Sequence, residues 1–98
     1  MQAKMNKWCK WVTETRPDVI HSKMMTLLNE SGFTIIDHQV HLFDPYGFTE
    51  LILLAESHFA IHTFPEEGKT YLELSSCVDG PFNKFLDLFQ EYIEEGRV

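Results

Sequence analysis

Short strand-like segments separated by turn sequences constrain the fold of this 98-residue chain more than any other feature. Residues 33–43 and 58–64 alternate apolar with polar side chains, which is typical of strands with one buried face. The turn residues Asp44-Pro45-Tyr46-Gly47 and Pro65-Glu66-Glu67-Gly68 follow them. Further strands at 48–56 and 70–76 complete an antiparallel meander. Because 48–56 is almost continuously apolar, we expect it to be central and covered on both faces.

Two helical patterns flank the predicted strands. The first begins at Pro17, with Asp18 near the positive end of the helix, and stops at Ser31-Gly32. The second opens at Pro81 and ends before Gly96, with large apolar residues recurring at helical spacing. The apolar stripes consist of Ile20, Met24, Leu27 and Leu28 in the first helix, and Phe82, Phe85, Leu86, Phe89, Tyr92 and Ile93 in the second.

This order of elements, with a possible short strand at 7–12, predicts an α+β fold. We expect a two-layer α/β sandwich, an antiparallel sheet with two helices on one face. The opposite face then needs a cover, and a second copy of the chain is the simplest candidate, so we expect a homodimer. No repeat or linker divides the sequence, and residues 1–98 are therefore predicted to form a single domain.

The composition argues against several classes of partner. A formal net charge of −7 disfavours binding to nucleic acid, and no apolar run approaches the roughly 20 residues of a membrane span. Residues 1–11 are basic but lack the apolar segment of a secretory signal. We therefore expect a cytoplasmic protein with no nucleic-acid or membrane partner, in which Cys9 and Cys77 are free thiols.

A polar sequence, Glu56-Ser57-His58, interrupts the apolar run that precedes it. Antiparallel pairing around the turn at 65–68 would return Cys77 to the end of the sheet that holds Ser57. His62 follows five residues after Ser57. The sequence therefore predicts a hydroxyl, an imidazole and a thiol within reach of one another.

Three kinds of site would use such residues. A Ser/His or Cys/His hydrolase is disfavoured because G-x-S-x-G and the family-specific cysteine motifs are absent. Glu56, His58 and His62 are zinc ligands by residue type, but the spacing H-x-x-x-H presents two imidazoles to one ion most readily on a helix. This segment reads as extended, so we expect no metal there. The third interpretation rests on a resemblance.

Two motifs carry that resemblance. L-A-E-S-H-F-A-I-H-T-F-P-E, at residues 54–66, and H-L-F-D-P-Y-G-F-T, at 41–49, together with Cys77 in a following strand, resemble the prokaryotic S-adenosylmethionine decarboxylases. The resemblance covers roughly residues 24–93. It implies an S-adenosylmethionine decarboxylase-like fold and a proenzyme that cleaves itself between Glu56 and Ser57. Ser57 Oγ attacks the preceding carbonyl, the amide becomes an ester, and elimination yields dehydroalanine and then a pyruvoyl group at residue 57.

The resemblance also implies the residue roles. His62 matches the processing histidine, Thr49 the hydroxyl that assists processing, and Cys77 the proton donor of the decarboxylation. Phe43 matches the aromatic residue that stacks on the adenine, and Glu66 the carboxylate that holds the ribose. The implied cofactor is the pyruvoyl group, which forms a Schiff base with S-adenosylmethionine. Its decarboxylated product is the aminopropyl donor for spermidine synthesis.

Two alternatives remain open on the sequence. One is a pyruvoyl-dependent decarboxylase of another amine, such as a basic amino acid, although Phe43 and Glu66 favour the nucleoside. The other is an unprocessed, non-catalytic paralogue that binds S-adenosylmethionine or activates an active partner. The terminal strands of the family are shortened in this chain, which supports that alternative, and Ser57, His62 and Cys77 argue against it.

Overall fold

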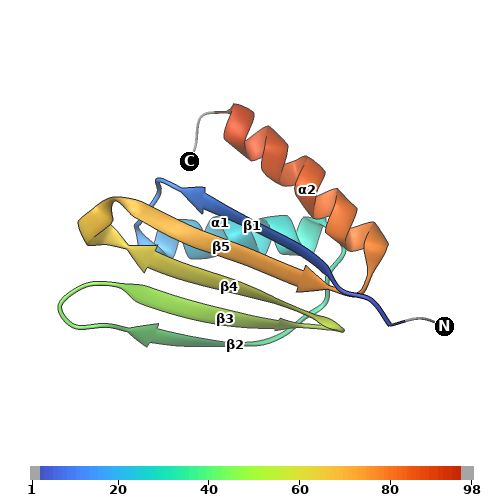
Figure 1. The fold of residues 1–98 in the computed structure, drawn as a ribbon, viewed down its shortest axis with the longest axis horizontal. Coiled ribbons are helices and arrows are strands. Elements are labelled where there is room, and N and C mark those ends of the chain that lie inside the picture. Colours follow the sequence, from blue (N-terminus) through green and yellow to red (C-terminus); the bar gives the residue numbers. More distant parts are fainter. Residues whose placement is uncertain (1–2, 96–98) are drawn as a thin grey trace.

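A five-stranded antiparallel sheet with two helices forms the structure, a computed structural model that describes residues 3–95 (Figure 1). The strand order across the sheet is β1-β5-β4-β3-β2. The elements along the chain are β1 (Asn6–Val12), α1 (Pro17–Glu30), β2 (Ile35–Leu42), β3 (Phe48–Leu54), β4 (Ser57–Phe64), a 3₁₀ turn η1 (Pro65–Glu67), β5 (Lys69–Ser76) and α2 (Asp79–Glu94). Every neighbouring pair of strands is antiparallel, as the alternation and the turns predict.

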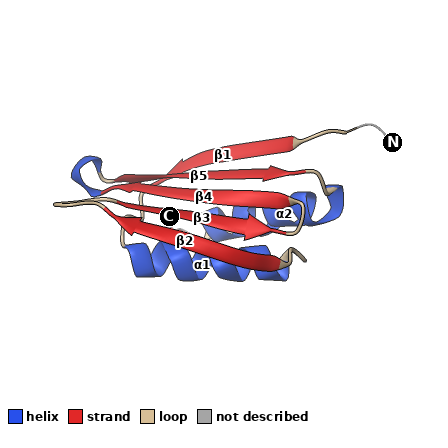
Figure 2. Cartoon of the chain, turned by 90° about the horizontal axis from the view of Figure 1, so that it is seen from below, coloured by secondary structure: helices blue, strands red, loops and turns tan. Residues whose placement is uncertain are grey.

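Both helices pack on the same side of the sheet (Figure 2), which confirms the predicted two-layer α+β sandwich. Helix α1 begins at Pro17 as expected. Helix α2 begins at Asp79, two residues before the predicted start at Pro81, because Val78 is still extended and the Asp79 carboxylate stands in the first turn. Helix α2 ends at Glu94, before Gly96 as predicted. No helix within residues 3–95 is long and apolar enough to span a membrane.

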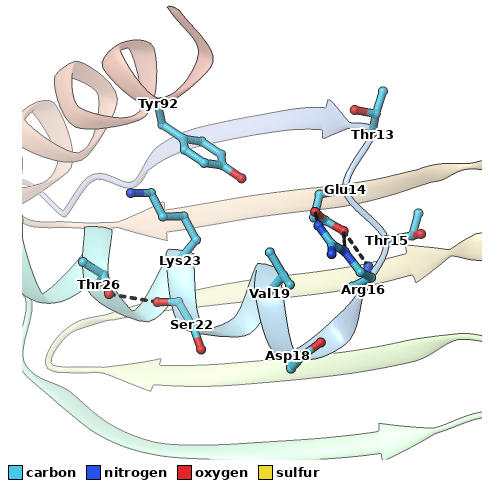
Figure 3. Close-up of a pocket in the computed structure, with 10 residues that line it drawn as sticks. All are labelled: Thr13, Glu14, Thr15, Arg16, Asp18, Val19, Ser22, Lys23, Thr26 and Tyr92. Atoms are coloured by element: carbon cyan, nitrogen blue, oxygen red, sulfur yellow. Dashed lines mark hydrogen bonds and ion pairs between the residues drawn. The ribbon is translucent and has the colours of Figure 1, made fainter. Parts of the chain in front are cut away.

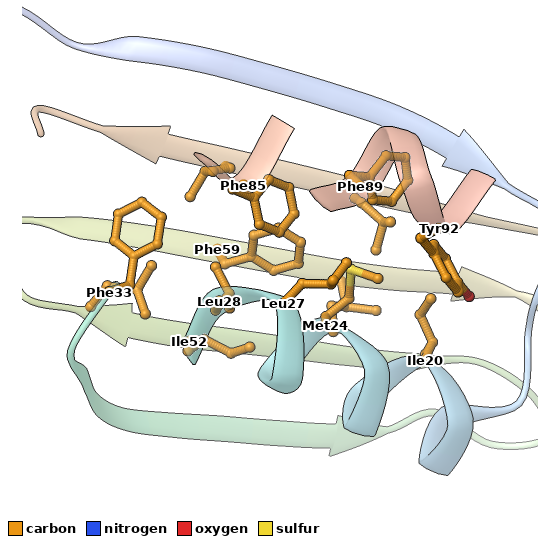
Figure 4. Close-up of a cluster of buried hydrophobic side chains, with 14 of the residues drawn as sticks. Ile20, Met24, Leu27, Leu28, Phe33, Ile52, Phe59, Phe85, Phe89 and Tyr92 are labelled. Atoms are coloured by element: carbon orange, nitrogen blue, oxygen red, sulfur yellow. The ribbon is translucent and has the colours of Figure 1, made fainter. Parts of the chain in front are cut away.

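The hydrophobic core lies between the sheet and the helices (Figure 4). Phe59 on β4 and Phe85 on α2 are fully buried and meet edge to face, with ring centroids 5.6 Å apart. Helix α1 adds Ile20, Met24, Leu27 and Leu28, the four residues of its predicted stripe. The aromatic stripe of α2 is therefore core, and it positions the sheet without contributing chemistry.

The possible strand at the N-terminus is confirmed as β1, an edge strand paired with β5. Trp8 turns toward α2, where its ring contacts those of Phe85 and Phe89 at centroid distances of 5.1 and 4.7 Å. Aromatic pairs of this kind contribute about 0.5–1.5 kcal/mol beyond their buried area. The strand therefore forms despite its many exposed positions, because Trp8 and Val12 supply its inner face.

Strand β3 corrects one expectation. It is an inner strand as predicted, but only one of its faces is covered, by the helices. Leu51 and Leu53 point to the other side and are 52% and 51% exposed. We call this uncovered side the open face, and it includes Thr49, Leu51, Leu53, His58, Ala60, His62, Tyr71, Glu73 and Ser75. A groove of about 330 Å³ lies there, lined in part by Leu51, Leu53 and His58.

The strand register separates two ends of the sheet. At one end Ser57 pairs with both Leu54 and Ser76, and we call this the Ser57 end. At the other end, which we call the Phe43 end, lie the turn after β2 and the turn after β4. The predicted functional residues are divided between these two ends.

Candidate active site

The Glu56–Ser57 peptide bond lies in the tight turn between β3 and β4, where only Ala55 and Glu56 separate the two strands. Glu56 has φ +61°, the only positive value among the non-glycine residues described. The left-handed conformation costs an L-amino acid roughly 1–2 kcal/mol, since Cβ crowds the following carbonyl oxygen. The peptide bond predicted to break therefore follows a strained residue.

Two donors of Cys77 approach the carbonyl oxygen of Glu56. The Cys77 thiol donates at 3.1 Å, and its backbone N–H donates at 3.5 Å. This oxygen belongs to the bond between Glu56 and Ser57, and it would carry negative charge if a nucleophile attacked its carbon. Donors placed beforehand at such an oxygen stabilise the charge as it develops. The antiparallel return of Cys77 to Ser57, predicted from the turn at 65–68, is confirmed.

The Ser57 side chain points to the helix side of the sheet and is only 6% exposed. Its hydroxyl donates to Ser76 Oγ at 2.7 Å. Ser76 Oγ in turn donates to the Val78 carbonyl at 3.2 Å and accepts from the Val78 N–H at 3.0 Å. The sequence analysis missed Ser76, although it pairs with Ser57 in the same strand alignment that returns Cys77 to Ser57.

Partial burial raises the pKa of the Cys77 thiol, and its hydrogen bond with the Glu56 side chain, 3.6 Å away, raises that pKa further. Both effects disfavour the thiolate. Cys77 is therefore held as a protonated thiol beside the turn, which is the state that a proton donor requires.

His62 and Thr49 form a second group on the open face. Thr49 Oγ1 lies 2.9 Å from His62 Nδ1, and the ring of Tyr71 stacks on His62 with centroids 6.2 Å apart. Sequence reasoning had named Thr49 and His62 separately, and the strand register brings them together. The Thr49–His62 contact was not predicted, because it depends on the pairing of β3 with β4.

The structure of one chain does not bring His62 to Ser57, which corrects the expectation of mutual reach. The two residues are five apart on β4, which spans roughly 16 Å of extended chain. An odd separation also places them on opposite faces of the sheet. The hydroxyl and the thiol are therefore near each other, and the imidazole is not.

The two predicted substrate contacts lie at the Phe43 end. Phe43 follows the last residue of β2, is 51% exposed, and meets the ring of His41 edge to face at 4.5 Å. Glu66 is exposed in the short turn η1. Both side chains are accessible to a ligand. Within one chain they are separated from Ser57 and Cys77 by the length of the sheet.

The side chains considered as zinc ligands in the sequence do not form a site. Glu56, His58 and His62 do not gather around a common point. Among the described residues, the group with metal-ligand spacing is His21, His38 and Glu50.

A wide hollow of about 1080 Å³ lies between the start of α1 and Tyr92 and contains none of the predicted site residues (Figure 3). In it, hydrogen bonds from Arg16 lower the pKa of the Glu14 carboxyl to about 2.

The fold and this geometry define an α+β sandwich in which a hairpin turn holds Glu56 at positive φ, with its carbonyl oxygen hydrogen-bonded to Cys77. A family model described as S-adenosylmethionine decarboxylase matches residues 9–98. The chain belongs to the S-adenosylmethionine decarboxylase family. The match includes the second half of β1, Cys9 to Val12, which the resemblance over residues 24–93 had left out.

Curated relatives named S-adenosylmethionine decarboxylase proenzyme include one from Thermosipho africanus, 35% identical over 81% of this chain and 62% of its own length. Another, from Fervidobacterium nodosum, is 39% identical over 63% of this chain and 45% of its own length. A third, from Acidithiobacillus ferrooxidans, is 34% identical over 72% of this chain and 53% of its own length. The chain thus spans between 45% and 62% of the length of these three relatives.

A solved structure supports the fold. The crystal structure of the adenosylmethionine decarboxylase from Aquifex aeolicus VF5 matches with a TM-score of 0.72. It covers 89% of this chain and 78% of that one, at 22% sequence identity. At this identity the likeness shows the shared α+β architecture.

Proposed function

We propose that this chain is a self-processing S-adenosylmethionine decarboxylase proenzyme, which cleaves between Glu56 and Ser57 and then decarboxylates S-adenosylmethionine. The observation that carries the proposal is the convergence of two Cys77 donors on the Glu56 carbonyl oxygen, beside the strained φ of Glu56. Membership of the decarboxylase family supports the same reaction.

In the cleavage step, the Ser57 hydroxyl oxygen attacks the carbonyl carbon of Glu56. The amide C–N bond breaks, the nitrogen of Ser57 gains a proton, and an ester joins the Glu56 acyl group to Ser57 Oγ. The Cys77 N–H and thiol stabilise the charge on the carbonyl oxygen during the attack. Ser76 orients the attacking hydroxyl through its 2.7 Å hydrogen bond. Removal of the Ser57 Cα proton then expels the Glu56 carboxylate and leaves dehydroalanine at residue 57. Its imine tautomer is hydrolysed by water, which releases ammonia and gives the pyruvoyl group.

The residues at this turn fit a pyruvoyl group. Its precursor would be Ser57, and the carbonyl oxygen of the preceding residue accepts two hydrogen bonds from Cys77. A pyruvoyl carbonyl supplies an electron sink for decarboxylation of an amine-bearing substrate. Cys77, protonated and beside residue 57, is the proposed donor of the proton that replaces CO₂. For the substrate, we propose that Phe43 stacks on the adenine and that Glu66 holds the ribose hydroxyls.

The division of these residues between two ends of the sheet supports a homodimer. The proposed location of the protein is the cytoplasm. Two chains that pack by their open faces, with a two-fold axis running across the strands, would place the Ser57 end of one over the Phe43 end of the other. His62 and Thr49, at the open face, would then approach residue 57 of the second chain. The half-exposed Leu51 and Leu53 supply apolar contact for such an interface.

The experiment is the intact mass of the purified chain over time. We expect two fragments, residues 1–56 and 57–98, with the second carrying a pyruvoyl terminus. Ser57→Ala should remain whole. Ser75→Ala is the matched control, because Ser75 is also a buried β5 neighbour of this turn but faces the other side of the sheet. A wild-type chain that stays whole contradicts self-processing, and CO₂ release from S-adenosylmethionine, ornithine and arginine identifies the substrate.

A second candidate function is favoured by one observation, the distance of His62 from Ser57 along β4. A chain without a base near the serine would stay intact and act as a non-catalytic binder of S-adenosylmethionine or as an activator of an active partner. The same mass measurement decides between the two. An intact wild-type chain that still binds S-adenosylmethionine in calorimetry would establish this second function.

A further inference from the structure

Glu50 is a charged residue at a core position. It is fully buried on the helix side of β3, in line with the buried apolar residues Phe48, Ile52 and Leu54. An isolated carboxylate in such surroundings is strongly unfavourable. The fold therefore has to provide hydrogen-bond partners or a cation for the Glu50 side chain.

Two histidines from other elements provide the contacts. Nδ1 of His21, on α1, lies 2.7 Å from one oxygen of the Glu50 carboxylate, and Nδ1 of His38, on β2, lies 2.8 Å from the other oxygen. In the part of the chain that the structure describes, these two imidazoles contact the Glu50 carboxylate, and no lysine or arginine forms a salt bridge with it. Three separate elements thus bring two imidazoles and one carboxylate to a single point.

The spacing suits one shared ion. The ligand atoms of His21, His38 and Glu50 all lie within 4.8 Å of one another. Around a tetrahedral zinc ion with bonds of about 2.0–2.2 Å, ligand atoms stand roughly 3.4 Å apart. The two imidazoles contact different oxygens of Glu50, at 2.7 and 2.8 Å. With an ion bound between the rings and the carboxylate, each of these distances would open by roughly 0.7 Å, which small side-chain rotations allow.

The imidazole rings of His21 and His38 are exposed enough for an ion to reach them from solvent. The side chains of His21 and His38 are 34% and 44% exposed, whereas that of Glu50 is not exposed at all. An ion can therefore enter between the rings from solvent, and water can occupy a fourth position. Two histidines and one glutamate with an open position form a common ligand set for zinc.

We propose that His21, His38 and Glu50 bind a divalent transition-metal ion of the zinc type. The site lies on the helix side of the sheet, behind the Thr49–His62 pair, and is separate from the cleavage turn. The bound ion links helix α1 to β2, an edge strand on which every residue is at least partly exposed. An ion that binds only the folded chain stabilises it by mass action.

The test uses an untagged Ser57→Ala chain treated with chelator, so that its result does not depend on self-processing. Zinc chloride is titrated by calorimetry, cobalt binding is followed by its visible spectrum, and unfolding temperatures are measured with and without zinc. We expect one zinc ion per chain, a tetrahedral cobalt spectrum without thiolate charge transfer, and a higher unfolding temperature with zinc.

Three variants locate the ion. Glu50→Gln keeps the size of the buried side chain, and His38→Ala changes a partly exposed edge residue, so the second remains informative if the first fails to fold. Each should weaken zinc binding at least about tenfold and abolish the thermal shift. His41→Ala is the matched control, an exposed histidine on the same strand that faces the other way, and it should bind zinc normally.

Three results would overturn the proposal. They are the absence of saturable zinc binding, equal binding by the parent chain and His38→Ala, and a thiolate band in the cobalt spectrum, which would assign the ion to a cysteine.

Discussion

At the scale of single residues, the candidate site depends on hydroxyl and thiol groups whose directions are set by strand pairing. Ser57 faces Ser76 across β4 and β5, and the 2.7 Å hydrogen bond between their hydroxyls follows from that register. Cys77, one residue further, faces the Glu56 carbonyl instead. Ser76 and Cys77, which are adjacent in the chain, thus hold the Ser57 hydroxyl and the Glu56 carbonyl, the proposed nucleophile and electrophile of the cleavage.

Replacing Ser76 tests the orientation of the nucleophile. Ser76→Ala removes the acceptor of the Ser57 hydroxyl, and a lost hydrogen bond of about 1 kcal/mol corresponds to about fivefold slower cleavage. A time course of precursor and fragments on denaturing gels measures the rate. The neighbouring Ser75→Ala variant should cleave at the wild-type rate. Equal rates for Ser76→Ala and wild type would show that Ser76 does not position Ser57.

The Cys77 thiol gives a prediction on pH. Its pKa lies above the ordinary value of 9.0 in the folded chain, chiefly through burial. The rate of iodoacetamide alkylation in a Ser57→Ala, Cys9→Ala chain should therefore rise at a higher pH when folded than in urea. A raised pKa in the folded state contributes stability that is present below the unfolded value and is lost as pH rises through the folded value. Coinciding alkylation profiles would contradict this assignment.

At the scale of elements, the hairpin of β3 and β4 concentrates strain at its turn. Two residues connect two strands of seven and eight residues, and one of them, Glu56, occupies the left-handed region. The strands are held on both sides by β2 and β5, so the turn cannot relax by separating them. The packed sheet thus keeps the Glu56–Ser57 bond in its strained conformation.

Relief of this strain is measurable in the uncleaved chain. Glu56→Gly in the Ser57→Ala background should raise the free energy of unfolding by about 1 kcal/mol, since glycine adopts positive φ without a Cβ clash. Urea unfolding measures the difference. Glu67→Gly is the control, because Glu67 has no positive φ, and it should leave stability unchanged or lower it. A loss of stability in Glu56→Gly would argue against strain at this turn.

At the scale of the whole molecule, the sheet separates two incomplete sets of functional residues. Ser57 and Cys77 lie at one end, and Phe43 and Glu66 at the other. Strands of seven or eight residues separate the two ends (Figure 1), which is roughly 23–26 Å of extended chain and more than a side chain spans. If these four residues form one site, as we propose, that site needs a second chain, and the half-exposed leucines of the open face offer apolar contact for it.

The open face is tested by a charged substitution. Leu53→Glu places a carboxylate in the proposed interface and should convert a dimer into monomers in sedimentation velocity, since burial of an unpaired charge is costly. Val40→Glu is the matched control, because Val40 is 48% exposed but faces the helix side at the edge of the sheet. A dimer that persists in Leu53→Glu, or dissociates equally in Val40→Glu, would exclude the open face as the interface.

A mixing experiment tests the shared site. Cys77→Ala and Glu66→Ala chains should each be inactive, but a mixture allowed to exchange subunits should recover about a quarter of wild-type activity. Half of the dimers are then mixed, and each mixed dimer holds one intact site of two. CO₂ release from S-adenosylmethionine measures the recovery. A mixture as inactive as its components would contradict the shared site, because it would show that each site takes Cys77 and Glu66 from the same chain.

Much of the fold follows from local patterns. The turn residues at 44–47 and 65–68 and the alternation of the strands predict the antiparallel order, and Pro17 marks the start of α1. The return of Cys77 to Ser57 also follows, because a tight turn fixes which residues pair. Ser76 could have been found by the same counting along β5.

The sequence by itself determined the strands, the helices and the residue types of the cleavage turn, since these depend on side-chain periodicity and on neighbours along the chain. Only the tertiary structure decided which face of β3 stays open and that His21, His38 and Glu50 meet. Both outcomes depend on packing between distant segments. Such contacts leave no periodic signal in the sequence, because they arise where helix α1 crosses a sheet whose register is already fixed.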